Sequence, residues 1–157
     1  MNNQEVSALK ELLVLPCFGK LEAIDVIVSN ERAKAPLAAL AVYVQHTKGA
    51  PCLRSVHTTL PSSYAPLSPR FASFCNGYSL VALTELYLNI KSNDAFQDVG
   101  DAFRGGGLLS LIELHFGSIS ALEKEQMDRL MEGVLASWHK GRGLREIHFE
   151  EIVECST

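Results

Sequence analysis

Residues 83–88 read Leu-Thr-Glu-Leu-Tyr-Leu, a leucine followed by alternating polar and apolar side chains. This pattern, Leu-x-x-φ-x-φ with φ an apolar residue, occurs five times along the chain, with Thr58 as a weak apolar match in the second copy. The copies open at Leu21, Leu53, Leu83, Leu111 and Leu144, which are 28 to 33 residues apart. Such alternation is typical of β-strands. A near-constant period of this size indicates a repeat architecture.

Segments with the apolar spacing of helices lie before and between these strands. The predicted helices cover residues 5–14, 35–47, 68–76, 93–105 and 120–138. Each helix between two strands is followed by a glycine that favours a helix end. The glycine signals are Lys48-Gly49, Asn76-Gly77, Gly105-Gly106-Gly107 and Gly141-Arg142-Gly143. Strands that alternate with helices through short links predict a parallel sheet in an α/β domain.

Composition predicts one globular domain over residues 1–157. Apolar residues make up 47% of the chain and charged residues 20%, and the formal net charge is −4. This charge argues against a nucleic acid or an anionic membrane as partner, since no basic surplus offsets phosphates. The N-terminus lacks the basic-then-apolar order of a signal peptide, so we expect a cytoplasmic protein. Four cysteines form no Cys-x-x-Cys pair, which predicts reduced, mostly buried thiols.

Residues 83–88 resemble the strand segment of leucine-rich-repeat proteins of the ribonuclease-inhibitor-like subclass. Asp98-Val99-Gly100-Asp101-Ala102-Phe103 resembles the helix opening of the same subclass. The resemblance covers residues 5–152. It implies an α/β solenoid of about five repeats, with short parallel strands on the concave face and helices on the convex face. Residues 5–14 would be its N-terminal capping helix. The alternative is a compact doubly wound α/β domain, in which strands also alternate with helices.

In such a solenoid the spacer residues of the pattern point away from the core. Three columns of outward positions follow: Ala23, Ser55, Glu85, Glu113, Glu146; then Asp25, His57, Tyr87, His115, His148; then Ile27, Thr59, Asn89, Gly117, Glu150. We expect a partner protein to bind the charged and ring-bearing members of these columns. The predicted binding residues are Asp25, His57, Glu85, Tyr87, Glu113, His115, Glu146, His148 and Glu150.

His115 and His148 would lie on neighbouring strands, about 4.8 Å apart, beside Glu113 and Glu146. Two imidazoles and a carboxylate suit zinc or another transition metal, and they also suit a pH-sensitive patch. A plain recognition face without metal or cofactor is the preferred interpretation. No serine or cysteine nucleophile accompanies the histidines, so no catalytic residue is assigned.

The sequence therefore predicts a non-catalytic interaction module or scaffold that works as a subunit of a larger complex. The family resemblance leaves two alternatives, a regulator of a small GTPase and a substrate-selecting subunit of a ubiquitin ligase. A metal-dependent enzyme of compact α/β fold is a further alternative. The last strand, predicted over residues 144–153, is an exposed sheet edge through which we expect homo- or hetero-oligomers to form.

Overall fold

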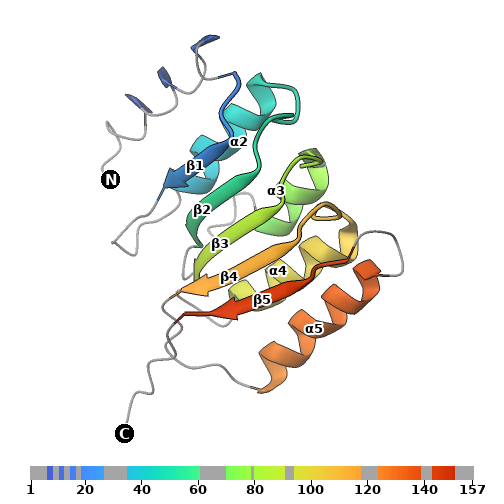
Figure 1. Ribbon diagram of the computed structural model, residues 1–157. Coiled ribbons are helices and arrows are strands. Elements are labelled where there is room, and N and C mark those ends of the chain that lie inside the picture. The colour runs from blue at the N-terminus through green and yellow to red at the C-terminus, as the bar shows by residue number, and fades with distance from the viewer. Residues whose placement is uncertain are drawn as a thin grey trace, which may run out of the picture.

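Strands and helices alternate along the chain in the computed structural model (Figure 1). The residues that the structure describes are 7–8, 11–12, 15–16, 19–26, 35–60, 70–78, 80–90, 94–117, 124–138 and 143–150. The elements are β1 (Ala23–Val26), α2 (Ala35–His46), β2 (Ser55–Leu60), α3 (Phe71–Tyr78), β3 (Glu85–Ile90), α4 (Asp94–Gly105), β4 (Glu113–Gly117), α5 (Lys124–Trp138) and β5 (Glu146–Phe149). None of the helices among these residues has the length and apolar character needed to cross a lipid bilayer.

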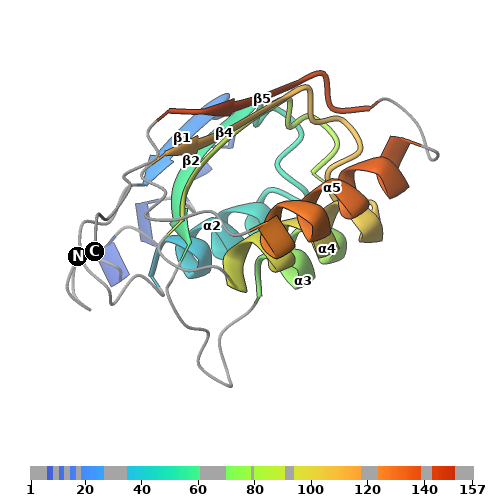
Figure 2. The same cartoon turned by 90° about the horizontal axis from the view of Figure 1, so that it is seen from below.

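The five strands form one parallel sheet in the order β1-β2-β3-β4-β5. Helices α2, α3, α4 and α5 lie together on one face of this sheet (Figure 2). The predicted α/β class with parallel strands is confirmed. The doubly wound alternative is wrong, because such a sheet reverses its strand order and carries helices on both faces.

The strands pair so that equivalent positions of successive copies lie side by side. Two columns cross the sheet: Ala23, Ser55, Glu85, Glu113, Glu146 and Asp25, His57, Tyr87, His115, His148. Both columns are the predicted ones. The prediction succeeds because each strand begins at the same distance after its leucine. Parallel pairing then places equivalent residues of neighbouring strands side by side.

The same backbone hydrogen bonds recur at the start of successive strands. The N–H groups of Leu53, Leu83 and Leu111 each donate to the carbonyl oxygen three residues earlier, at 3.0 to 3.2 Å. The next two N–H groups then donate to one carbonyl oxygen in the preceding copy, as those of Thr84 and Glu85 do to Arg54, each at 2.9 Å. These bonds fix which residue of each strand pairs with which residue of the preceding strand.

The core lies between the sheet and the helix layer. The leucines that open the second to fifth copies, Leu53, Leu83, Leu111 and Leu144, are at most 5% exposed. Phe116 of β4 contacts Phe96 of α4, with 5.2 Å between the ring centroids. The leucines and φ residues of the second to fourth copies are therefore core residues, as predicted, whereas Leu21, Ile147 and Phe149 are partly buried against this core. These positions fix which side chains remain on the other face of the sheet.

Helix α3 ends later than predicted. The signal Asn76-Gly77 indicated its end, but the helix continues to Tyr78. The Asn76 side chain accepts a hydrogen bond from the backbone N–H of Gly107 at 3.0 Å. Asn76 therefore ties α3 to the turn after α4 and does not stop the helix. Gly106, with φ +85°, lies in the predicted stop after α4, which ends at Gly105.

The first turn of α3 is capped from another helix. The buried carboxylate of Asp98, in α4, accepts the backbone N–H groups of Phe71 at 2.8 Å and Ala72 at 3.2 Å. Ser68, the first residue of the range predicted for this helix, lies outside the described residues. The resemblance placed Asp98 at a helix opening. In the structure it lies within α4, and the helix that it caps is α3.

Several predictions fall partly outside the described residues. Of the predicted capping helix 5–14, residues 7, 8, 11 and 12 are described, and these are helical and exposed. Residues 151–157, which follow β5, are not described, so association through that sheet edge stays a prediction. Cys75 is buried and Cys52 half-buried, both as free thiols, in agreement with the prediction for these two cysteines.

Candidate binding face on the sheet

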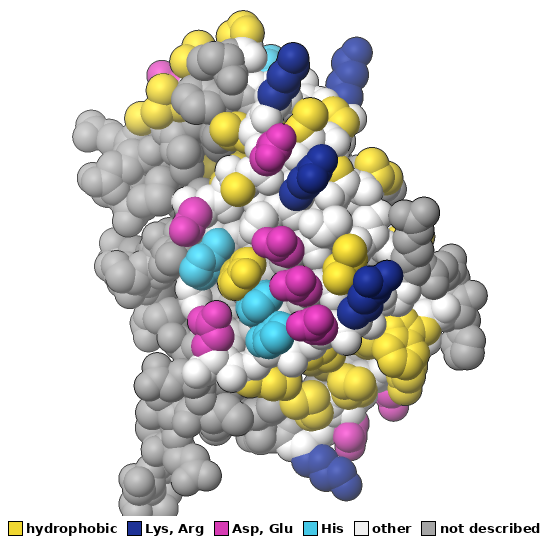
Figure 3. All heavy atoms as spheres, in the orientation of Figure 1, with side chains coloured by type: hydrophobic (Ala, Val, Ile, Leu, Met, Phe, Trp, Pro, Cys, Tyr) yellow, Lys and Arg dark blue, Asp and Glu magenta, His cyan; other side chains and the backbone are white. Residues whose placement is uncertain are grey.

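The side of the sheet opposite the helices carries the polar positions of the strands. We call this surface the sheet face; its residues are Ala23, Asp25, Ser55, His57, Glu85, Tyr87, Asn89, Glu113, His115, Gly117, Glu146, His148 and Glu150. All nine predicted binding residues belong to it. Acidic and histidine side chains gather there over the strands (Figure 3). Of the predicted third column, Thr59 is buried and is not counted in this face. Ile27 lies outside the described residues.

Four rings form a ladder across β2 to β5. The ring of His57 lies 5.5 Å from that of Tyr87, centroid to centroid, and is tilted by 41°. Tyr87 stacks on His115 at 4.0 Å and 14°, and His115 stacks on His148 at 4.3 Å and 11°. This ring ladder follows from the column register, because neighbouring strands hold equivalent side chains one strand spacing apart.

Each histidine of the ladder lies beside a carboxylate. His57 Nδ1 is 3.7 Å from Asp25 Oδ2, on the neighbouring strand β1. His115 Nε2 is 3.4 Å from Glu113 Oε2, and His148 Nε2 is 3.1 Å from Glu146 Oε2, both within a strand. Because residues two apart in a strand share a face, the spacing Glu-x-His by itself brings the last two pairs together.

Asn89 is a sheet-face residue that the prediction did not assign to the site. Its Nδ2 lies 3.3 Å from Nε2 of His57, so the two ring nitrogens of this histidine contact an amide and a carboxylate. The signal was present in the sequence, since Asn89 occupies the third outward column. Only the register between β2 and β3 brings it beside a ring 32 residues away.

The electrostatic field of the face disfavours negative charge. Burial raises the pKa of the Tyr87 hydroxyl, and the carboxylates of Glu85, Glu113 and Glu150 raise it further. Glu85, Glu113 and Glu146 lie directly beside one another on β3, β4 and β5. Like charges at such positions destabilise a sheet. No lysine or arginine belongs to the sheet face, and none of the described ion pairs of its carboxylates involves one.

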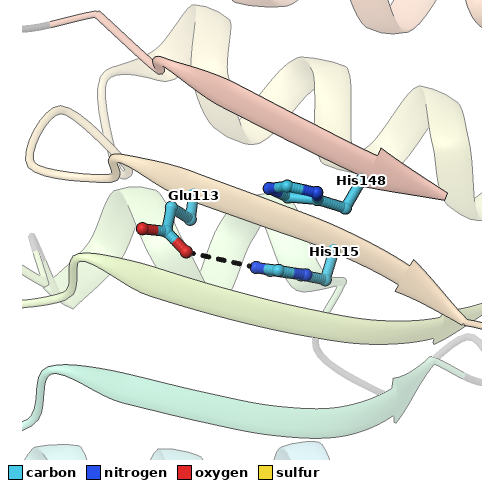
Figure 4. Close-up of side chains that lie close together, drawn as sticks. All are labelled: Glu113, His115 and His148. Atoms are coloured by element: carbon cyan, nitrogen blue, oxygen red, sulfur yellow. Dashed lines mark hydrogen bonds and ion pairs between the residues drawn. The ribbon is translucent and has the colours of Figure 1, made fainter. Parts of the chain in front are cut away.

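Glu113, His115 and His148 form the closest cluster of potential metal ligands among the described residues. One ligand atom from each lies within 4.8 Å of the other two. Figure 4 shows the carboxylate reaching toward His115, with the ring of His148 from the neighbouring strand stacked alongside. The exposed fractions of the side chains are 37% for Glu113, 13% for His115 and 44% for His148, so the cluster is open to solvent on one side.

Comparisons with protein-family models, with curated proteins and with solved structures find no match for this chain. Carboxylates and imidazoles cross five adjacent strands without a cationic side chain among them, which is an arrangement suited to positively charged groups.

Proposed function

We propose that the chain is a leucine-rich-repeat solenoid of about five repeats, similar to the ribonuclease-inhibitor-like subclass. Three features support this assignment. Strands follow one another in sequence order through the sheet, all described helices lie on one face, and the hydrogen bonds that start each strand recur from copy to copy. Each repeat buries its apolar residues only by stacking on its neighbours, which is how solenoids gain their stability.

We propose that this solenoid is a non-catalytic interaction module whose sheet face binds a basic segment of a partner protein. The observation that carries the proposal is the row Glu85, Glu113 and Glu146, whose mutual repulsion no ion pair to a lysine or arginine relieves among the described residues. A partner with lysine or arginine side chains would remove this repulsion on binding. Complementary charge of this kind also favours rapid and specific encounter.

The uncovered state of the face supports the same function. Parallel sheets in soluble proteins are usually covered by other elements on both faces. Here the side chains of Asp25, Glu146 and His148 are 66%, 59% and 44% exposed. A parallel sheet with one polar face that no described residue covers leaves a surface that a partner can occupy without displacing any part of the chain that the structure describes.

The dimensions of the face suit a helix or a loop. Five strands at about 4.8 Å spacing span about 19 Å, and five residues of each strand span about 17 Å. A stable interface buries about 800 Å² on each partner, which is more than this flat area provides. We therefore expect the partner to place one basic segment on the sheet face and to reach beyond it onto the flanking loops.

The test compares two variants with equal changes in charge. The face variant is Glu85→Gln with Glu150→Gln, and the control is Asp128→Asn with Glu132→Gln, at exposed positions of α5 in the helix layer. Quantitative mass spectrometry of affinity-purified complexes measures partner recovery. We expect about tenfold weaker binding for the face variant, since two exposed ion pairs contribute about 1.4 kcal/mol together.

The control should recover the partner at the wild-type level. Binding of the partner by the wild type should weaken at raised salt concentration. Equal recovery by the wild type and the face variant would show that the sheet face does not bind the partner. Neither substituted glutamate of the face variant is a member of the histidine cluster on β4 and β5, so the variant leaves that cluster intact.

A further inference from the structure

We propose that Glu113, His115 and His148 bind a divalent first-row transition-metal ion of the zinc type on the sheet face. The proposal goes beyond partner binding and does not depend on it. Among the described residues these three bring one carboxylate oxygen and two imidazole nitrogens within 4.8 Å of one another (Figure 4).

Two of the ligand atoms already have the spacing that zinc requires. Zinc–ligand bonds of about 2.0–2.1 Å place the corners of a tetrahedron about 3.4 Å apart. His115 Nε2 and Glu113 Oε2 are 3.4 Å apart. The ligand atom of His148 lies within 4.8 Å of the other two, so it has to approach by at most about 1.4 Å to reach this spacing. The pairing of His115 with His148 across β4 and β5 places both rings on the same face of the sheet.

The orientation of the rings identifies which ligand moves. His115 and His148 are stacked with only 11° between their planes, and two parallel rings cannot both point a nitrogen lone pair at one ion between them. His115 is held from the other side by Tyr87, at 4.0 Å, and is 13% exposed. His148 is 44% exposed and belongs to an outer strand, so its ring turns while that of His115 stays in place.

The donor atoms select the class of metal. Imidazole nitrogens with a carboxylate oxygen suit zinc, copper, nickel and iron, whereas magnesium and calcium prefer oxygen ligands alone. Three protein ligands leave a further coordination position, which faces solvent on this open sheet. A water molecule or a side chain of a bound partner can occupy that position.

The surroundings favour a cation at this place. Glu85 and Glu146 flank Glu113 on the neighbouring strands, and no lysine or arginine of the sheet face competes for these carboxylates. Glu146 Oε2 also lies 3.1 Å from Nε2 of His148. When His148 binds the ion through Nδ1, this carboxylate accepts the proton of Nε2, which orients the ring and increases its basicity. His57 has Asp25 beside it but stacks only on Tyr87, so the ladder contains a single pair of adjacent imidazoles.

The test is a calorimetric titration of Zn²⁺ into the reduced, chelator-treated chain. The wild type should bind one ion. His148→Ala should weaken binding at least tenfold, and His115→Ala and Glu113→Gln should weaken it as well. His57→Ala is the matched control, because it removes a histidine of the same ring ladder that is not in the cluster. Circular dichroism without metal verifies the fold of each variant; the exposed His148 makes its variant the decisive one.

Co²⁺ in place of Zn²⁺ provides an independent readout. Visible d–d absorption without a thiolate charge-transfer band is expected for nitrogen and oxygen ligands, and it should disappear in His148→Ala. Failure of the wild type to bind one ion, or undiminished binding by His148→Ala, would overturn the proposal. A thiolate band would do so too, because it would place the metal on cysteines. Glu85→Gln with Glu150→Gln should still bind zinc, so loss of partner and loss of metal are separable.

Discussion

His115 is the least exposed of the three ladder histidines, at 13%, against 31% for His57 and 44% for His148. It packs between Tyr87 and His148, and its Nε2 contacts Glu113. Stacked rings of this kind stabilise a sheet through cross-strand contact. One side chain therefore supports the sheet in the free protein and, in our proposal, supplies a fixed metal ligand.

Cys75, at the other side of the sheet, gives a prediction about alkaline stability. Its thiol is fully buried in α3, and burial raises its pKa well above the ordinary value, with the charge of Asp98 adding to the effect. The unfolded thiol ionises at about pH 8.5. Above that pH the unfolded state releases a proton that the folded state keeps. The free energy of unfolding should therefore fall with rising pH, by up to about 1.4 kcal/mol per pH unit.

Urea denaturation between pH 7 and pH 10 measures this dependence. The comparison protein is Cys75→Ala, which is less stable at every pH because of the cavity but should lose less stability as the pH rises. All other ionisable groups are common to both proteins, so the difference in slope belongs to this thiol. Parallel slopes for the two proteins would contradict the assignment of a buried, protonated Cys75.

Helices α4 and α5 pack closely because glycines face each other between them. A β-carbon on Gly133 would overlap the backbone carbonyl of Gly100, and one on Gly100 would lie 2.8 Å from the carbonyl oxygen of Arg129. Backbone cannot yield as a flexible side chain can. We expect Gly133→Ala to lower the free energy of unfolding by about 1–3 kcal/mol, the usual cost of overpacking.

The control for this substitution is Gly77→Ala in α3. A β-carbon there meets no atom within 4 Å, and alanine favours the helix, so this variant should be neutral or more stable by up to about 1 kcal/mol. Chemical denaturation of both variants provides the comparison. If Gly133→Ala unfolds at the same denaturant concentration as the wild type, the two helices do not approach as closely as the structure has them.

At the scale of elements, local pattern predicts the strands well and some helix ends poorly. Strand positions follow from alternation of apolar residues after each leucine, which is a property of neighbouring residues. The continuation of α3 past Asn76 involves a hydrogen bond to Gly107, and its N-terminal cap is Asp98. These partners are 31 and 27 residues away from the residues that they contact. A turn signal in the local sequence carries no information about partners so far away along the chain.

The residues of the sheet face could be predicted because the pairing register of the strands could be predicted. Once each strand starts at a fixed distance from its leucine, the columns of outward residues follow from the sequence, including the column from Asp25 to His148. Ring orientations, the approach of Asn89 to His57 and the burial of Thr59 depend on three-dimensional packing. The sequence therefore did not predict the ring orientations or the contact between Asn89 and His57, and the predicted outward position of Thr59 was wrong.

At the scale of the whole molecule, the sheet separates an apolar face from a polar one. One face carries the leucines that pack on the helices, and the other carries carboxylates and rings contributed by segments about 30 residues apart in sequence. The two proposals share Glu113 but otherwise use different residues, since partner binding rests on the row with Glu85 and Glu146, and metal binding on His115 and His148. Both require that equivalent positions of successive strands are in fact neighbours on it.

Nuclear Overhauser spectroscopy of the isolated chain, with selectively labelled histidine and tyrosine, measures that neighbourhood most directly. Ring centroids 4.0 Å apart for Tyr87 and His115, and 4.3 Å apart for His115 and His148, predict strong cross-peaks between the ring protons of both pairs. His148→Ala should remove the second set and leave the first. Absence of both sets of cross-peaks in the folded wild type, or contacts of His115 with core leucines instead, would contradict the parallel register and the binding face built on it.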